Sequence, residues 1–256
     1  MALEDLVDSK ARPEQVAGGF RFTEGPVFSR RGYLLFSDIP SNRILKWERG
    51  RLTTFREGSN GANGLTFDHQ GRLLVCETGK VARTEKDGSN TVLASEGLER
   101  PNDLVYAIDG SIYFTDLPKS RVYQITRKGT LRMVAGDCAA PNGVALSPNQ
   151  QKLYLADSKQ RVLRVYDIAA DGALANSQVF SECRCDGLKT DERGNVWVAS
   201  DGGIRVFDAA GKGLGVIGIP EEPSNCNWGP GFRGLYVTAR TSVYFVPTRV
   251  TGTRTY

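Results

Sequence analysis

The chain has 256 residues and a formal net charge of +4, from 33 basic and 29 acidic side chains. The basic residues are scattered and form no patch or motif of a nucleic-acid binder, and no apolar run approaches the about 20 residues that span a bilayer. Residues 1–10 lack the basic and apolar regions of a signal peptide. The five cysteines favour reduced thiols over a disulfide framework. We therefore expect a cytoplasmic protein, monomeric, with no nucleic-acid or membrane partner.

A short strand signature recurs along the chain, as in Leu34-Leu35-Phe36-Ser37-Asp38 and Ile112-Tyr113-Phe114-Thr115-Asp116. Six copies end at residues 38, 77, 116, 157, 200 and 239, so that they are 39, 39, 41, 43 and 39 residues apart. A period near 40 residues is typical of HEAT-type helical repeats or of four-stranded propeller blades. Tight-turn sequences precede the copies and no sustained helical stripe accompanies them, which favours the blades.

The sequence therefore predicts an all-β fold, a six-bladed β-propeller of four-stranded antiparallel blades. We expect one domain over residues 1–256, because no linker-like tract divides the chain. The sixth copy runs out soon after Val243-Tyr244-Phe245-Val246, one strand short of a blade. An open ring would expose a sheet edge, so residues 14–22 are expected to supply the missing outer strand.

A polar residue recurs where the innermost strand of each blade should begin, about eight residues before the turn into the signature strand. All six equivalents are Glu, Asp or Asn, namely Glu24, Asn63, Asn102, Asn142, Asp186 and Asn225. The alternative is turn chemistry, since Asn-Gly and Asp-Gly are turn dipeptides. That alternative does not explain Glu24 or Asn102, nor the common register. We expect the six side chains to ring the propeller axis.

Oxygen atoms that converge from six blades suit a hard cation. Two carboxylates and up to four carboxamides resemble a calcium site, while Zn²⁺, Mn²⁺ or Mg²⁺ are alternatives. The single histidine, His69, lies in a turn expected at the opposite end of its blade. A Ser-His-Asp or Cys-His hydrolase is therefore disfavoured.

Further polar residues are expected on the face where the inner strands begin. Asp116 ends the signature strand of the third blade and Arg100 precedes Asn102 by two residues. Arg100 is a candidate for binding a polar or anionic substrate group, with a plain surface arginine as the alternative. For the ring of strand-end acids, the alternatives are substrate contact and capping of the strand end. Its members are Asp38, Glu77, Asp116 and Asp157.

Four segments together resemble the gluconolactonase, senescence-marker-protein (regucalcin) and luciferin-regenerating-enzyme family. They are Thr23-Glu24-Gly25-Pro26, Arg100-Pro101-Asn102-Asp103, Pro141-Asn142-Gly143-Val144 and Cys185-Asp186-Gly187. The resemblance implies that Glu24, Asn142 and Asp186 ligate one divalent cation, with Asn102 a further ligand or a substrate contact. Asn63 would then line the substrate pocket, and Asn225 would do the same.

The resemblance also implies a metal-dependent lactonase, which acts on a small-molecule lactone or related ester. The cation would polarise the carbonyl, and Asp186 would act as general base or as nucleophile. Two alternatives stay open: a non-catalytic ligand- or protein-binding propeller, and a specialised biosynthetic enzyme that uses the same site on another carbonyl substrate.

The chain departs from the gluconolactonase pattern in two places. The family commonly has Cys-Glu-His in the second blade, where this chain has Cys76-Glu77-Thr78. A long insertion that usually follows the third-blade signature is also absent after Asp116. Both changes remove material from the substrate side, so we expect a more open pocket.

Overall fold

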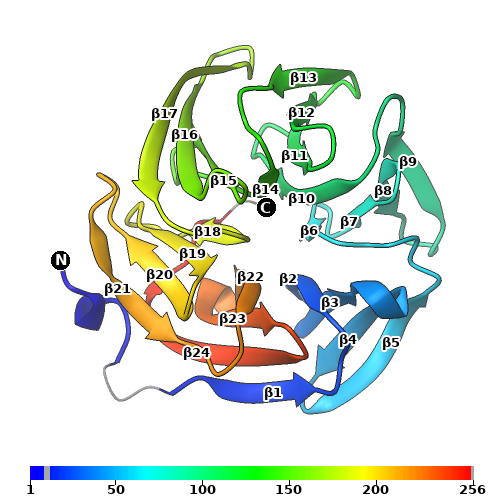
Figure 1. The fold of residues 1–256 in the computed structure, drawn as a ribbon. Helices are drawn as coiled ribbons and strands as arrows, with labels where there is room; N and C mark the ends of the chain where they lie inside the picture. Colours follow the sequence, from blue (N-terminus) through cyan, green and yellow to red (C-terminus); the bar gives the residue numbers. More distant parts are fainter. Residues whose placement is uncertain (9–11, 255–256) are drawn as a thin grey trace.

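The computed structural model describes residues 1–8 and 12–254, in which 24 strands form six four-stranded sheets. Neighbouring strands in each sheet are antiparallel, and Figure 1 shows the sheets arranged as blades around a common axis. The predicted six-bladed β-propeller is confirmed. In the described residues, helical structure is limited to three short 3-10 turns, η1 (Leu3–Asp5), η2 (Ile39–Ser41) and η3 (Pro230–Phe232).

The first three blades follow one another along the chain, each from its inner to its outer strand. Blade 1 contains β2 (Thr23–Ser29), β3 (Tyr33–Asp38), β4 (Arg43–Glu48) and β5 (Arg51–Glu57). Blade 2 contains β6 (Leu65–Phe67), β7 (Leu73–Glu77), β8 (Lys80–Thr84) and β9 (Asn90–Ala94). Blade 3 contains β10 (Pro101–Tyr106), β11 (Ile112–Asp116), β12 (Arg121–Ile125) and β13 (Leu131–Ala135).

The last three blades repeat this order, except that the outer strand of blade 6 comes from the N-terminal segment. Blade 4 contains β14 (Pro141–Leu146), β15 (Lys152–Asp157), β16 (Val162–Ile168) and β17 (Leu174–Glu182). Blade 5 contains β18 (Leu188–Thr190), β19 (Val196–Ser200), β20 (Gly203–Phe207) and β21 (Gly213–Gly218). Blade 6 contains β22 (Pro223–Trp228), β23 (Arg233–Ala239), β24 (Ser242–Thr251) and β1 (Glu14–Gly18).

The apolar core lies between blades. Successive residues of a strand point to opposite faces of its sheet, so Leu34 and Phe36 of β3 pack against blade 6 while Leu35 packs against blade 2. Burial on both faces explains why the signature strands are almost continuously apolar. Each of the six blade interfaces holds one such cluster, so a blade is stabilised chiefly by its neighbours.

Ring closure ties the two ends of the chain together. Strand β1 pairs with β24 from Glu14 opposite Phe245 to Gly18 opposite Ser242, and Figure 1 shows it along the edge of blade 6. This strand is shorter than the expected 14–22. Before it, Leu6 is fully buried in the cluster between blades 5 and 6, and its carbonyl accepts a 2.7 Å hydrogen bond from the Arg249 N–H.

Removal of residues 1–22 is expected to destabilise the whole propeller. The deletion unpairs β24 and removes Leu6 and Phe20, two buried side chains worth about 1.5–3 kcal/mol each. We expect chemical denaturation to show a loss of at least about 3 kcal/mol. Substitution of the exposed Glu14 by Ala is the control. A truncated protein that unfolds at the same denaturant concentration as the intact chain would contradict this account of closure.

Candidate functional site

The inner strands β2, β6, β10, β14, β18 and β22 surround the axis (Figure 1). In blades 1, 3, 4 and 6, the pairing of the inner strand with its neighbour shifts register close to its start. Such a bulge sets two residues against one and re-aims their side chains. Two consecutive residues of each blade thus occupy this point, and we call them the first and second axial positions.

The strand registers align these positions in all six blades. For example, Pro101 pairs with Asp116 and Pro141 with Asp157, so that Asn102 and Asn142 are equivalent. The first axial positions are Glu24, Asn63, Asn102, Asn142, Asp186 and Ser224. The second axial positions are Gly25, Gly64, Asp103, Gly143, Gly187 and Asn225.

This alignment corrects the assignment of Asn225. The sequence spacing places Asn225 level with Asn102, but in the structure Pro223 pairs with Ala239 and Asn225 with Thr238. Asn225 therefore occupies the second axial position, and Ser224 the first. The spacing misled because blade 6 makes its turn through η3, which includes Gly231 and Phe232 at positive φ, and not through a short hairpin.

Glycine at the second axial position permits adjacent inner strands to approach closely. A Cβ added to Gly25, at φ +55°, would lie 2.2 Å from the carbonyl oxygen of Asn63. One added to Gly187 would lie 2.0 Å from Cγ of Asn225. Since the φ of Gly187 is not positive, close approach explains its Asp-Gly pair better than a turn does.

Glu24, Asn142 and Asp186 lie close together at the axis. Glu24 is 5% exposed, while Asn142 and Asp186 are partly exposed. The Asn142 amide lies close enough to the Asp186 carboxylate to lower its pKa. Oε2 of Glu24 accepts bonds from the Gly25 N–H at 2.8 Å and from Nδ2 of Asn225 at 3.0 Å. These bonds leave Oε1 of Glu24 and Oδ1 of Asn142 as candidate ligand atoms.

The acids of this site perturb one another. Burial, then the charges of Asp186 and Asp103, raise the pKa of Glu24 well above its ordinary value, against the hydrogen bonds from Asn225 and Gly25. Burial raises the pKa of Asp186 to about 7, with Arg184 opposing, Asp103 adding to the rise and Asn142 opposing. Clustered buried acids that raise one another's pKa mark a candidate functional site.

Sequence reasoning missed Asp103, the third carboxylate of the axis. Asp103 is 2% exposed and lies at the second axial position of blade 3, opposite Asn225 of blade 6. Its Oδ1 accepts the Leu104 N–H at 2.9 Å, and its Oδ2 lies 3.4 Å from Nδ2 of Asn225. The available signal was that Asp103 stands where four blades have glycine.

Asn225 bridges Glu24 and Asp103 as a donor. Its Oδ1 accepts the Cys226 N–H at 2.8 Å, which fixes the amide so that Nδ2 faces both carboxylates. Asn225 thereby orients the carboxylates and offers no oxygen to the axis. Arg184, also unanticipated, lies near Asp186 and pairs with Glu222 and with Asp201, the latter at 3.2 Å.

The remaining predicted site residues of blade 3 lie at or beside its first axial position. Asn102 is partly exposed and its carbonyl accepts the Gly64 N–H at 2.8 Å. Arg100 is exposed. Asp116 is fully buried, and its two oxygens accept the N–H groups of Glu99 at 2.8 Å and of Arg100 at 3.0 Å. This favours the capping alternative for Asp116, which holds the loop that leads to Asn102.

The oxygen donors fit a hard cation, although the acids alone do not form its site. In residues 1–8 and 12–254, no three His, Cys, Asp or Glu side chains are grouped to hold a metal ion. A site here therefore depends on amide oxygens. Asn63 offers one, because its Oδ1 is buried and has no hydrogen-bond partner in the described part of the chain. A buried acceptor without a donor is uncommon unless it binds something else.

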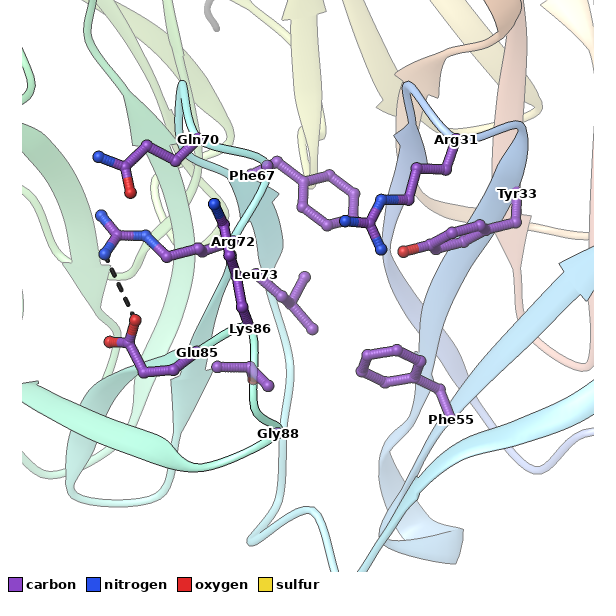
Figure 2. Close-up of a pocket in the computed structure, with 12 residues that line it drawn as sticks. Arg31, Tyr33, Phe55, Phe67, Gln70, Arg72, Leu73, Glu85, Lys86 and Gly88 are labelled. Atoms are coloured by element: carbon purple, nitrogen blue, oxygen red, sulfur yellow. Dashed lines mark hydrogen bonds and ion pairs between the residues drawn. The ribbon is translucent and has the colours of Figure 1, made fainter.

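The single histidine and the five cysteines lie outside the axial positions. His69 contacts Tyr106 away from the axis, and the five cysteines are unpaired. A groove of about 250 Å³ lies between blades 1 and 2, where Figure 2 shows Tyr33 and Phe55 across from Phe67. It contains none of the axial residues, so we locate the candidate site at the axis. No helix among the described residues is long and apolar enough to cross a membrane.

Comparison with known proteins gives consistent matches. A family model described as SMP-30/Gluconolactonase/LRE-like region matches residues 22–241. A gluconolactonase from Zymomonas mobilis is 29% identical, over 98% of this chain and 85% of the relative. A pentonolactonase from Haloferax volcanii is 29% identical, over 85% of this chain and 81% of the relative. A solved gluconolactonase structure from Xanthomonas campestris has a TM-score of 0.90 and 29% identity, over 96% and 92% of the two chains.

The raised pKa of Asp186 predicts that the metal-free protein loses stability as pH rises. The unfolded carboxyl ionises near 3.8 while the folded one keeps its proton to about 7, so the unfolded state binds fewer protons between these values. In that window Asp186→Asn is expected to gain stability relative to the native chain, by at most about 4 kcal/mol near pH 7. Denaturation in the presence of a chelator at a series of pH values measures this.

The control for the pH series is Glu96→Gln, which removes an exposed acid. Its free energy of unfolding should change with pH in the same way as that of the native chain. If the free energy of unfolding of Asp186→Asn also follows that of the native chain at every pH, the pKa of Asp186 is not raised.

Proposed function

The chain belongs to the SMP-30/gluconolactonase/LRE-like family, and on this premise we propose that it is a lactonase, a hydrolase of the ester bond in a small cyclic ester. The family expected from the sequence is confirmed. The proposal rests on one observation: the side chains of Glu24, Asn142 and Asp186 lie close together at the axis. Relatives with 29% identity that act on glucono- and pentonolactones support it.

We assign Glu24, Asn142 and Asp186 as holders of one divalent cation, with Asn102 and the unpartnered Oδ1 of Asn63 as further oxygens. Calcium fits this all-oxygen donor set first, because it takes six to eight oxygen ligands; Zn²⁺, Mn²⁺ and Mg²⁺ remain alternatives. When bound, such a cation would polarise the lactone carbonyl and stabilise negative charge on its oxygen.

Asp186 is the candidate for moving the proton. Its pKa of about 7 belongs to the metal-free protein, and a bound cation would lower it, so Asp186 would act as a weak base on a water that the cation acidifies. As base, its carboxylate takes a proton from water while the water oxygen bonds to the carbonyl carbon. It then returns the proton to the ring oxygen as the acyl carbon–oxygen bond breaks, leaving a hydroxy acid. As nucleophile, it would first form an acyl intermediate that water cleaves.

We assign substrate binding to Arg100 and to two of the axial amides. Arg100 is exposed on the loop that Asp116 holds, so its guanidinium is available to polar groups of a sugar-like ring. Asn102 and Asn63 lie at the first axial positions of blades 3 and 2, and substrate contact is the alternative to their role as cation ligands. The short segment after Asp116 suits a small lactone with an open approach.

The test is hydrolysis of glucono- and pentonolactones by protein stripped of metal and then reloaded with Ca²⁺, Zn²⁺, Mn²⁺ or Mg²⁺. We expect turnover above the spontaneous rate with at least one cation, and its loss when a chelator is added. Asp186→Asn is expected to lower kcat/KM by about 100-fold or more, the contribution of a positioned general base. Glu24→Gln is expected to weaken cation binding.

Glu96→Gln serves again as the control, because Glu96 is exposed and lies outside the axial positions. Absence of both cation binding and turnover with every cation tested would exclude the metal-dependent lactonase. Cation binding without turnover of any lactone would favour the non-catalytic alternative.

A further inference from the structure

A lysine reaches into the axis next to the candidate site. Lys189 lies on β18, three residues after Asp186, and its side chain is 17% exposed. Its Nζ donates to the Leu188 carbonyl at 2.9 Å and lies 4.0 Å from Oδ2 of Asp103. Since Lys189 belongs to blade 5 and Asp103 to blade 3, this ion pair connects two blades that are not neighbours.

The surroundings of Lys189 show that this position is internal. A cavity of about 30 Å³ next to it is lined by residues of β6, β10, β14, β18 and β22. The neighbouring polar group Asn227 is already occupied, because its Nδ2 donates to the Pro26 carbonyl at 2.8 Å. Leu146 and Thr66, from blades 4 and 2, also line the cavity. Asp103 is the carboxylate within ion-pair distance of Lys189 in the described residues.

The charges on the axis explain what this lysine can do. Glu24, Asp103 and Asp186 are close enough to repel one another electrostatically. With all three ionised, the axis would carry three negative charges, one more than a divalent cation neutralises. The Lys189 ammonium offsets the charge of Asp103. The two remaining negative charges, on Glu24 and Asp186, then match the charge of one divalent cation.

We propose that Lys189 is an internal cation that sets the charge of the candidate metal site and thereby limits its affinity for divalent ions. Asn225 connects the candidate cation ligands to Lys189. Its Nδ2 donates to Glu24 and also faces Asp103, which is the ion-pair partner of Lys189. This inference rests on the proposed metal site and adds to it a positioning residue that contacts neither cation nor substrate.

The proposal predicts that loss of Lys189 strengthens divalent-ion binding, whereas a substitution that only disturbs the fold would weaken it. In Lys189→Met the site keeps its ligands and loses a nearby positive charge, so it should bind divalent ions at least about tenfold more tightly, by Coulomb interaction at an effective dielectric of about 20. Calorimetric titration of metal-free protein with Ca²⁺, or with Mn²⁺ where Ca²⁺ does not bind, measures this, with native chain and variant compared at the same pH. The same variant should melt at a lower temperature without metal, because Asp103 loses its partner.

Three further variants keep the test independent of folding defects. Lys212→Met makes the same substitution on the exposed turn between β20 and β21 and should leave affinity unchanged. Asp103→Asn should weaken binding, and the double variant Asp103→Asn/Lys189→Met should return it close to that of the native chain.

An unchanged or weaker affinity in Lys189→Met, with native affinity in Lys212→Met, would overturn the inference and leave the lactonase proposal intact. A native chain that binds no divalent ion would overturn the metal site and this inference together. Tighter binding in Lys189→Met would support the inference even if no lactone is hydrolysed.

Discussion

The constraint on which the site depends is the burial of several carboxylates around one axis. Burial and mutual repulsion both disfavour the charged forms of Glu24 and Asp186. The protein offsets this with Asn225, with backbone N–H donors such as that of Gly25, and with Arg184 and Lys189 at the two ends of the cluster. The cluster is thus held partly neutralised, in a state that an added cation would relieve.

The propeller supplies this arrangement through local departures from regular strands. Regular inner strands would alternate their side chains between the two neighbouring blades. The bulges at the starts of β2, β10, β14 and β22 instead offer consecutive residues at the axis. Glycine at the second axial position then allows close approach of neighbouring strands, as Gly25 does beside Asn63. Blades 3 and 6 break this rule with Asp103 and Asn225, which meet across the axis.

The sequence was sufficient for the architecture and for part of the site. The 40-residue period predicts six blades because every blade must bury both faces, which leaves the same apolar run in each repeat. The level of Glu24, Asn142 and Asp186 follows from the same register. Asn225 was placed one position off because blade 6 turns through η3 and its spacing therefore differs, and Asp103 was missed because only the first axial position was compared between blades. Lys189 resembles an exposed strand lysine until the fold shows that its strand is innermost.

The two ends of the axis differ in how far they are covered. At the far end, Thr253 donates its N–H to the Thr190 carbonyl at 3.0 Å, and the hydroxyl of Thr190 bonds that of Thr253 at 2.8 Å. These bonds draw residues near the C-terminal end of the described chain over the cavity beside Lys189. At the near end, Asn102, Asn142 and Asp186 are partly exposed. A lactone would therefore reach the acids from the near side, with Lys189 behind them and out of contact with substrate.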